Sequence, residues 1–161
     1  MVENRRLYLV RHGHAVSDAV DPERPLSERG REMVARVAKW AAGQGLQVER
    51  IRHSGKRRAE ETAGIFALHL KPAGGSRATP GLAPNDEVRV VAKALEYEQK
   101  NVMLVGHLPF MGRLAALLIE SNPEADVVAF PEAGLACLEH DGALWSLKFV
   151  ASPESIAKNG V

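Results

Sequence analysis

The 161-residue sequence contains a single cysteine, Cys137, and lacks any long apolar run. One cysteine excludes an intramolecular disulfide framework and is typical of a protein from a reducing compartment. A helix that crosses a membrane needs about 18 or more consecutive apolar residues, so none is predicted. The apolar run near the N-terminus, residues 7–10, is too short for the core of a signal peptide. We therefore expect a cytoplasmic protein that does not associate with a membrane.

The sequence also lacks an excess of charge of either sign. Lys and Arg total 21 and Asp and Glu total 20, which gives a net charge of +1 with neutral histidines. A general nucleic-acid binder needs a basic excess or a basic face, so nucleic acid is not an expected partner. Hydrophobic residues make up 45% of the chain and charged residues 25%, which is normal for a folded globular protein. The length predicts one domain over residues 1–161.

Short apolar runs alternate with segments of helical spacing along most of the chain. The predicted strands are residues 7–10, 48–53 and 101–106, with a short edge strand near 77–79. The predicted helices are residues 27–42, 57–70, 86–97 and 109–119. This alternation predicts an α/β fold, a three-layer α/β/α sandwich around a mostly parallel sheet. Residues 133–140 and 143–150 flank Asp141-Gly142, which predicts a C-terminal antiparallel hairpin.

Two local details accompany this prediction. Ser27 is placed to cap the helix that begins after it. In the helix near residues 86–97, the spacing predicts that Val90, Val91, Ala94 and Leu95 face inward.

Residues that can handle phosphate follow three predicted strands. The segments are Arg11-His12-Gly13, His53-Ser54-Gly55 and Gly106-His107. The carboxyl ends of parallel strands meet at one edge of a sheet, where sites form, so we expect these segments to converge. Taken singly, each segment could also be an ordinary polar strand end or a structural histidine.

The chemistry of these residues suits phosphoryl transfer. The imidazole of His12 can accept a phosphoryl group because one ring nitrogen is unprotonated near neutral pH. The guanidinium of Arg11 can grip two phosphate oxygens, and His107 could stabilise charge on the transferring group. Basic residues at the beginning of a helix oppose the helix dipole, and a bound anion would compensate them. Helical spacing places Arg58 beside the buried face at Ala59.

Other site classes fail on spacing. Gly106 and Gly112 are separated by five residues, and Arg113 follows where a P-loop needs Lys. Gly43-Gln44-Gly45 follows a helix and has no third glycine, so it is no dinucleotide-binding turn. His12 and His14 could begin a metal site, but no cluster of further ligands completes it. We expect neither a metal nor another cofactor.

Four stretches together resemble the histidine phosphatase superfamily, and more closely its SixA-type phosphohistidine phosphatases. They are, in order, residues 9–13 (LVRHG), 24–30 (RPLSERG), 54–62 (SGKRRAEET) and 105–109 (VGHLP). The resemblance covers roughly residues 7–150 and implies the phosphoglycerate mutase-like fold. Inserted cap segments of larger members are missing from this chain.

The resemblance implies a role for each matching residue. His12 is the nucleophile and becomes transiently phosphorylated. Arg11, Arg58 and His107 bind the phosphoryl oxygens and stabilise the transition state, and Arg24 adds a further contact. Positive side chains then supply the charge that Mg²⁺ supplies in other phosphoryl-transfer enzymes.

The sequence departs from the family pattern at three places. Gly55 stands where proline is frequent, and His14 stands where an acidic residue is frequent. The general acid of larger members comes from an insert that is missing here. Asp86 or Glu87 is the nearest candidate, and either could instead be a helix-start residue.

The resemblance implies a hydrolase that removes phosphate from phosphohistidine on a partner protein, such as a phosphotransfer domain. A small-molecule phosphomonoesterase with the same residues is the first alternative. A phosphate-binding or phosphoprotein-binding module without catalysis is the second. Mutase activity is the least favoured, because holding and turning an intermediate needs a closed site.

Overall fold

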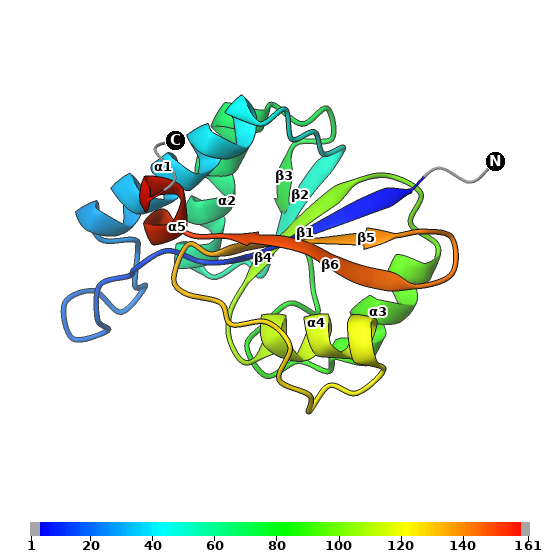
Figure 1. Ribbon diagram of the computed structural model, residues 1–161. Coiled ribbons are helices and arrows are strands. Elements are labelled where there is room, and N and C mark those ends of the chain that lie inside the picture. Colours follow the sequence, from blue (N-terminus) through cyan, green and yellow to red (C-terminus); the bar gives the residue numbers. More distant parts are fainter. Residues whose placement is uncertain (1–3, 159–161) are drawn as a thin grey trace.

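A central six-stranded sheet organises the chain in the computed structural model, which describes residues 4–158 (Figure 1). The strand order is β3-β2-β4-β1-β5-β6. The strands are β1 (Arg5–Arg11), β2 (Arg50–His53), β3 (Ser76–Ala78), β4 (Val102–Gly106), β5 (Leu135–His140) and β6 (Trp145–Ala151). The first four run parallel to one another, whereas β5 and β6 are antiparallel and form the predicted hairpin.

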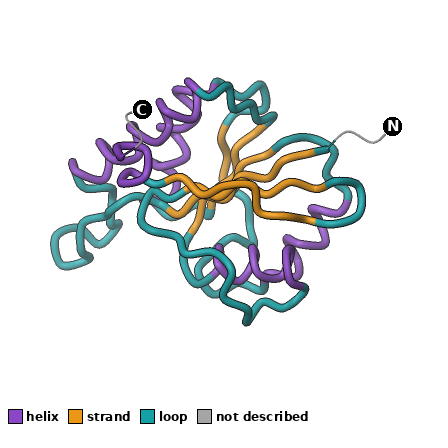
Figure 2. The backbone as a smooth tube through the Cα atoms, viewed as in Figure 1, coloured by secondary structure: helices purple, strands orange, loops and turns teal. Residues whose placement is uncertain are grey.

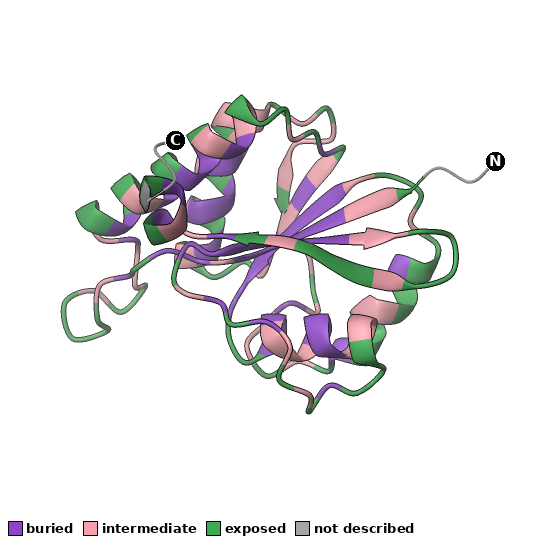
Figure 3. Ribbon diagram, viewed as in Figure 1, coloured by how far each residue is buried: buried purple, intermediate pink, exposed green. Residues whose placement is uncertain are grey.

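Helices cover both faces of the sheet, which makes the molecule an α/β/α sandwich (Figure 2). The helices are α1 (Glu28–Gly43), α2 (Arg57–Leu70), α3 (Val88–Glu96), α4 (Phe110–Glu120) and α5 (Pro153–Lys158). Tyr8 and Val10 of β1 pack with α1, α2 and α5, whereas Leu7 and Leu9 pack with α3 and α4. The run at 7–10 is apolar throughout because β1 is buried on both faces (Figure 3).

Most predicted elements have the expected positions, and the fold class is confirmed. Helix α2 begins and ends as predicted, and Ser27 caps α1 by accepting a hydrogen bond from the Gly30 amide at 2.9 Å. Sequence reasoning missed α5, which packs against α1. Ser152 and Ser155 form reciprocal side-chain hydrogen bonds at its beginning, a signal that the sequence already contained.

The expected inward face of α3 was partly wrong. Val90 is 67% exposed and Ala94 is also exposed, whereas Val88 and Leu95 are buried. Helix α3 starts after its N-cap at Glu87, and Val88 packs with residues of α4. The buried stripe therefore begins at Val88. Spacing alone allowed two adjacent stripes on this short helix, and packing against α4 selected one of them.

Within the described range, no helix is long and apolar enough to cross a membrane. Residues 1–3 and 159–161 lie outside that range.

Candidate active site

The three predicted segments meet at the carboxyl edge of the parallel strands. β1 pairs with β4 so that Arg11 lies opposite Gly106, and β2 pairs with β4 so that His53 lies opposite Val105. The His12 amide donates a hydrogen bond to the Gly106 carbonyl at 2.9 Å. This bond keeps the segment after β1 beside the segment after β4. As a result the rings of His12 and His107 stand with their centroids 5.0 Å apart.

The hydrogen bond of His12 fixes which of its ring nitrogens carries the proton. Nδ1 lies 2.7 Å from the Gly13 carbonyl oxygen. A carbonyl can only accept, so Nδ1 is the protonated nitrogen and Nε2 keeps its lone pair. Burial, together with the charges of Arg58 and Arg11, lowers the pKa of His12 to about 4, although the bond to Gly13 opposes the shift. The ring is therefore neutral at pH 7, with a nucleophilic Nε2.

Glycine is needed at two positions where the segment after β1 meets α1. A Cβ atom on Gly13 would lie 2.5 Å from a methyl carbon of Val34. A Cβ atom on Gly30 would lie 2.1 Å from the carbonyl oxygen of His14. Neither position leaves room for a side chain, so the backbone around His12 is pressed directly onto the first turn of α1.

Thr62 ties the nucleophile segment to the helix that carries Arg58. Its hydroxyl accepts a hydrogen bond from the Gly13 amide at 3.1 Å and donates one to the Arg58 carbonyl at 2.8 Å. The side chain is fully buried, so water cannot replace either bond.

Replacing Thr62 by valine is expected to lower the free energy of unfolding by about 1–3 kcal/mol, because the buried amide of Gly13 loses its acceptor while the shape is kept. Urea denaturation measures this loss. Thr79→Val is the matched control, since the Thr79 side chain is partly exposed and its amide, not its hydroxyl, bonds to His53. Equal midpoints for the Thr62 and Thr79 variants would contradict the prediction.

His107 is held by the hydroxyl of Ser54, whose oxygen lies 2.7 Å from Nε2. The same oxygen accepts the amide hydrogen of Lys56 at 3.3 Å, which leaves the hydroxyl hydrogen free to point at the ring. When Ser54 donates to Nε2, the neutral ring of His107 carries its proton on Nδ1, which can then donate. Burial and the charges of His12, Arg58, Lys56 and Arg24 lower the pKa of His107 to about 3, so this ring is also neutral.

Three side-chain nitrogen atoms at this edge are buried but unpaired. Within the described part of the chain, Nε of Arg11, Nε of Arg58 and Nδ1 of His107 have no hydrogen-bond partner. The one other such atom, Nε of Arg5, lies at the opposite end of β1. A buried polar nitrogen without a partner is costly, and several of them at one edge of the sheet favour an acceptor with several oxygens. Because two of the three belong to guanidinium groups, the fitting ligand is an anion.

Arg24 reaches the same region on the loop between β1 and α1. Its Nε donates to the Val16 carbonyl at 3.0 Å, and its backbone has a φ of 48°. Burial, and to a smaller extent the positive charge of Arg24, lower the pKa of Arg58. Glu61 anchors this loop by accepting the Leu26 amide hydrogen at 2.7 Å.

The two predicted acid candidates are used at the beginning of α3. A carboxylate oxygen of Asp86 accepts the Ala83 amide hydrogen at 2.9 Å. Glu87 is the N-cap residue, accepts the Arg89 amide hydrogen at 3.1 Å, and forms an ion pair with the Arg89 side chain. Glu87 therefore has the helix-start role that the sequence left open, whereas Asp86 closes the turn before α3.

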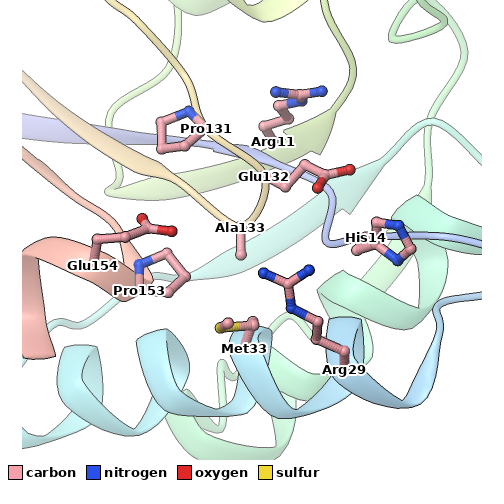
Figure 4. Close-up of a pocket in the computed structure, with 9 residues that line it drawn as sticks. All are labelled: Arg11, His14, Arg29, Met33, Pro131, Glu132, Ala133, Pro153 and Glu154. Atoms are coloured by element: carbon pink, nitrogen blue, oxygen red, sulfur yellow. The ribbon is translucent and has the colours of Figure 1, made fainter.

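A pocket of about 310 Å³ adjoins the site beside Arg11 (Figure 4). It lies between the end of β1, the first turns of α1, the loop before β5 and the beginning of α5. Its lining comprises Arg11, His14, Arg29, Met33, Pro131, Glu132, Ala133, Pro153 and Glu154. Sequence reasoning missed Glu132, because no motif links residue 132 to the distant nucleophile. In the described residues, no group of three His, Cys, Asp or Glu side chains could hold a metal ion.

The comparisons with known proteins agree with this geometry. Residues 7–83 match the sequence pattern of the histidine phosphatase superfamily (branch 1). The chain is 31% identical over 118 residues to the phosphohistidine phosphatase SixA of Escherichia coli (strain K12). The aligned region covers 70% of this chain and 73% of SixA. The chain therefore belongs to the histidine phosphatase superfamily and is a phosphatase of that superfamily.

Two solved structures of SixA proteins are similar to this chain in fold and sequence. The structure of the protein histidine phosphatase SixA complexed with tungstate superimposes with a TM-score of 0.83 at 27% identity, over 94% of this chain and 99% of that one. A SixA structure from Agrobacterium tumefaciens has a TM-score of 0.76 at 26% identity, over 92% of this chain and 98% of that one. Tungstate is a tetrahedral oxyanion.

Proposed function

We propose that the protein removes phosphate from phosphohistidine on a partner protein through a covalent phospho-His12 intermediate. The observation that carries the proposal is a buried, neutral His12 with its Nδ1 committed to Gly13, beside the unpaired donors of Arg11, Arg58 and His107. This arrangement combines a free nucleophile with donors arranged in advance for phosphoryl oxygens.

In the first step Nε2 of His12 attacks phosphorus. The new P–N bond forms as the bond from phosphorus to the leaving group breaks, and its electron pair goes to the leaving atom. Arg11, Arg58, Arg24 and the Nδ1–H of His107 stabilise the charge on the phosphoryl oxygens. In the second step water attacks phosphorus, and the electron pair of the P–N bond returns to Nε2 as inorganic phosphate leaves.

The choice of a protein substrate has two supports. The relatives described above are named for phosphohistidine or protein histidine phosphatase activity. The chain also lacks the cap inserts of larger superfamily members, and an uncovered site suits a phosphorylated side chain presented on another protein. The partner we propose is a phosphohistidine-bearing protein such as a phosphotransfer domain.

The test is to incubate the protein with a phosphohistidine-bearing phosphotransfer domain, quench the reaction, and map acid-labile phosphate by mass spectrometry. Label on His12 together with phosphate release supports the proposal. Faster turnover of sugar or nucleotide phosphates than of the phosphoprotein would favour a small-molecule phosphomonoesterase. Phosphate binding with neither label nor release on any substrate would favour a binding module and overturn the proposal.

A further inference from the structure

A tight turn before β5 holds Glu132 in a defined position. The Gly134 amide donates to the Pro131 carbonyl at 2.8 Å, which closes the turn, and Ala133 has a φ of 62°. A non-glycine residue rarely adopts this conformation, so the surrounding structure must enforce it. Backbone strain of this kind is frequent at active sites and ligand-binding sites.

The turn is fastened to the nucleophile segment itself. The Ala133 amide donates to the His12 carbonyl at 3.2 Å, and the Arg11 amide donates to the Gly134 carbonyl at 3.0 Å. Glu132 thus immediately precedes the residue bonded to the backbone of His12. Burial is the main cause that lowers the pKa of His12, and the charge of Glu132 opposes this shift, as expected of a nearby carboxylate.

The carboxylate of Glu132 is available for chemistry. It is exposed on the pocket that also borders Arg11, His14 and Arg29 (Figure 4). Among residues 4–158, none of the ion pairs involves Glu132. By contrast, the carboxylates of Asp86 and Glu87 are occupied at the beginning of α3. Glu132 is therefore the unengaged carboxylate next to the nucleophile segment.

Phosphoryl transfer leaves a proton to be supplied. A leaving group with a basic atom needs a proton as its bond to phosphorus breaks, and the attacking water must lose one in the second step. Both rings at this edge are unsuited to this task, because His12 is the nucleophile and His107 is held neutral as a donor. A carboxyl group can donate a proton in one step, and its carboxylate can take one up in the next.

We propose that Glu132 is the proton-transferring residue of the site and that the pocket beside it receives the leaving group. The Glu132 carboxyl gives its proton to the leaving atom as the bond to phosphorus breaks and the P–N bond to His12 forms. The resulting carboxylate takes a proton from the water that attacks phospho-His12, which restores the starting state. This inference rests on the covalent route of the proposed function and adds to it the acid–base residue.

The experiment compares Glu132→Gln with the wild type on two aryl esters. Phenyl phosphate releases a basic phenolate that needs a proton, whereas p-nitrophenyl phosphate releases an anion that leaves without one. The variant is expected to lose about 10²-fold in kcat/KM on phenyl phosphate and no more than about threefold on p-nitrophenyl phosphate. A structural role would lower both rates equally.

Asp126→Asn is the matched control, because it removes the same charge from an exposed residue of the same loop. It is expected to leave both rates within about twofold of the wild type. Equal losses on the two esters, or no loss on either, would overturn the role of Glu132. A third outcome separates this role from the proposed substrate. If Glu132→Gln loses activity only on phenyl phosphate, but the wild type does not dephosphorylate a phosphohistidine protein, the role of Glu132 stands and the proposed substrate is overturned.

Discussion

Replacing His12 by asparagine is expected to lower the rate of phosphate release by on the order of 10⁴-fold or more, because the proposed covalent route loses its nucleophile. Asparagine is smaller than histidine but keeps an amide donor for the Gly13 carbonyl, so the fold should persist. The measurement is single-turnover phosphate release from a phosphohistidine protein, with mass spectrometry of the quenched enzyme. No acid-labile phosphate should remain on the variant.

His69→Asn is the control for this experiment. His69 lies in the last turn of α2, outside the candidate site, and is expected to tolerate the change with rates within about threefold of the wild type. Thermal unfolding of both variants separates loss of chemistry from loss of structure. A His12 variant that is folded and still turns over, or a label that appears on another histidine, would contradict the assignment of His12.

Replacing Arg58 by alanine is expected to lower kcat/KM by about 10²–10³-fold, because the change removes the donor that we propose for the phosphoryl oxygens of the transition state. Arg58→Lys should recover only part of this loss, since lysine restores the charge but not the planar fork of donors. Steady-state kinetics on p-nitrophenyl phosphate measures both effects.

Arg57 offers a control one residue away. Its side chain is exposed and forms ion pairs with Glu23 and Glu61, away from the unpaired donors. Exposed ion pairs contribute about 0–1 kcal/mol, so Arg57→Ala is expected to change kcat/KM by less than about fivefold. Equal effects at the two positions would show that net charge, and not the position of Arg58, governs anion binding.

The neighbouring arginines also show what sequence patterns can resolve. Apolar spacing in residues 57–70 indicated a helix whose buried face includes Ala59, and the structure bears this out. Since Arg58 adjoins that face, it is drawn partly inward, whereas Arg57 points to solvent. Periodicity is a local property, so it was readable without any knowledge of the partners of the helix.

The same reasoning reached its limit at α3. The apolar residues of α3 allow more than one buried stripe. Packing against α4 buries Val88 and leaves Val90 exposed. Asp86 and Glu87 raised a similar ambiguity, because an acidic residue before a helix can cap it or serve a site. In the folded chain Glu87 caps α3 through the Arg89 amide, whereas Asp86 accepts the Ala83 amide and closes the turn before the helix.

By itself the sequence determined the alternating elements, the buried central strand and the three polar strand ends that converge. Those features depend on residues close in the chain and on the rule that parallel strands align their carboxyl ends. Only the tertiary structure decided that Nε2 of His12 is the free nitrogen and that Glu132 comes to lie beside the nucleophile segment. The reason is physical: β5 pairs with β1 across more than 120 residues, and no local pattern encodes a contact made by pairing at that separation.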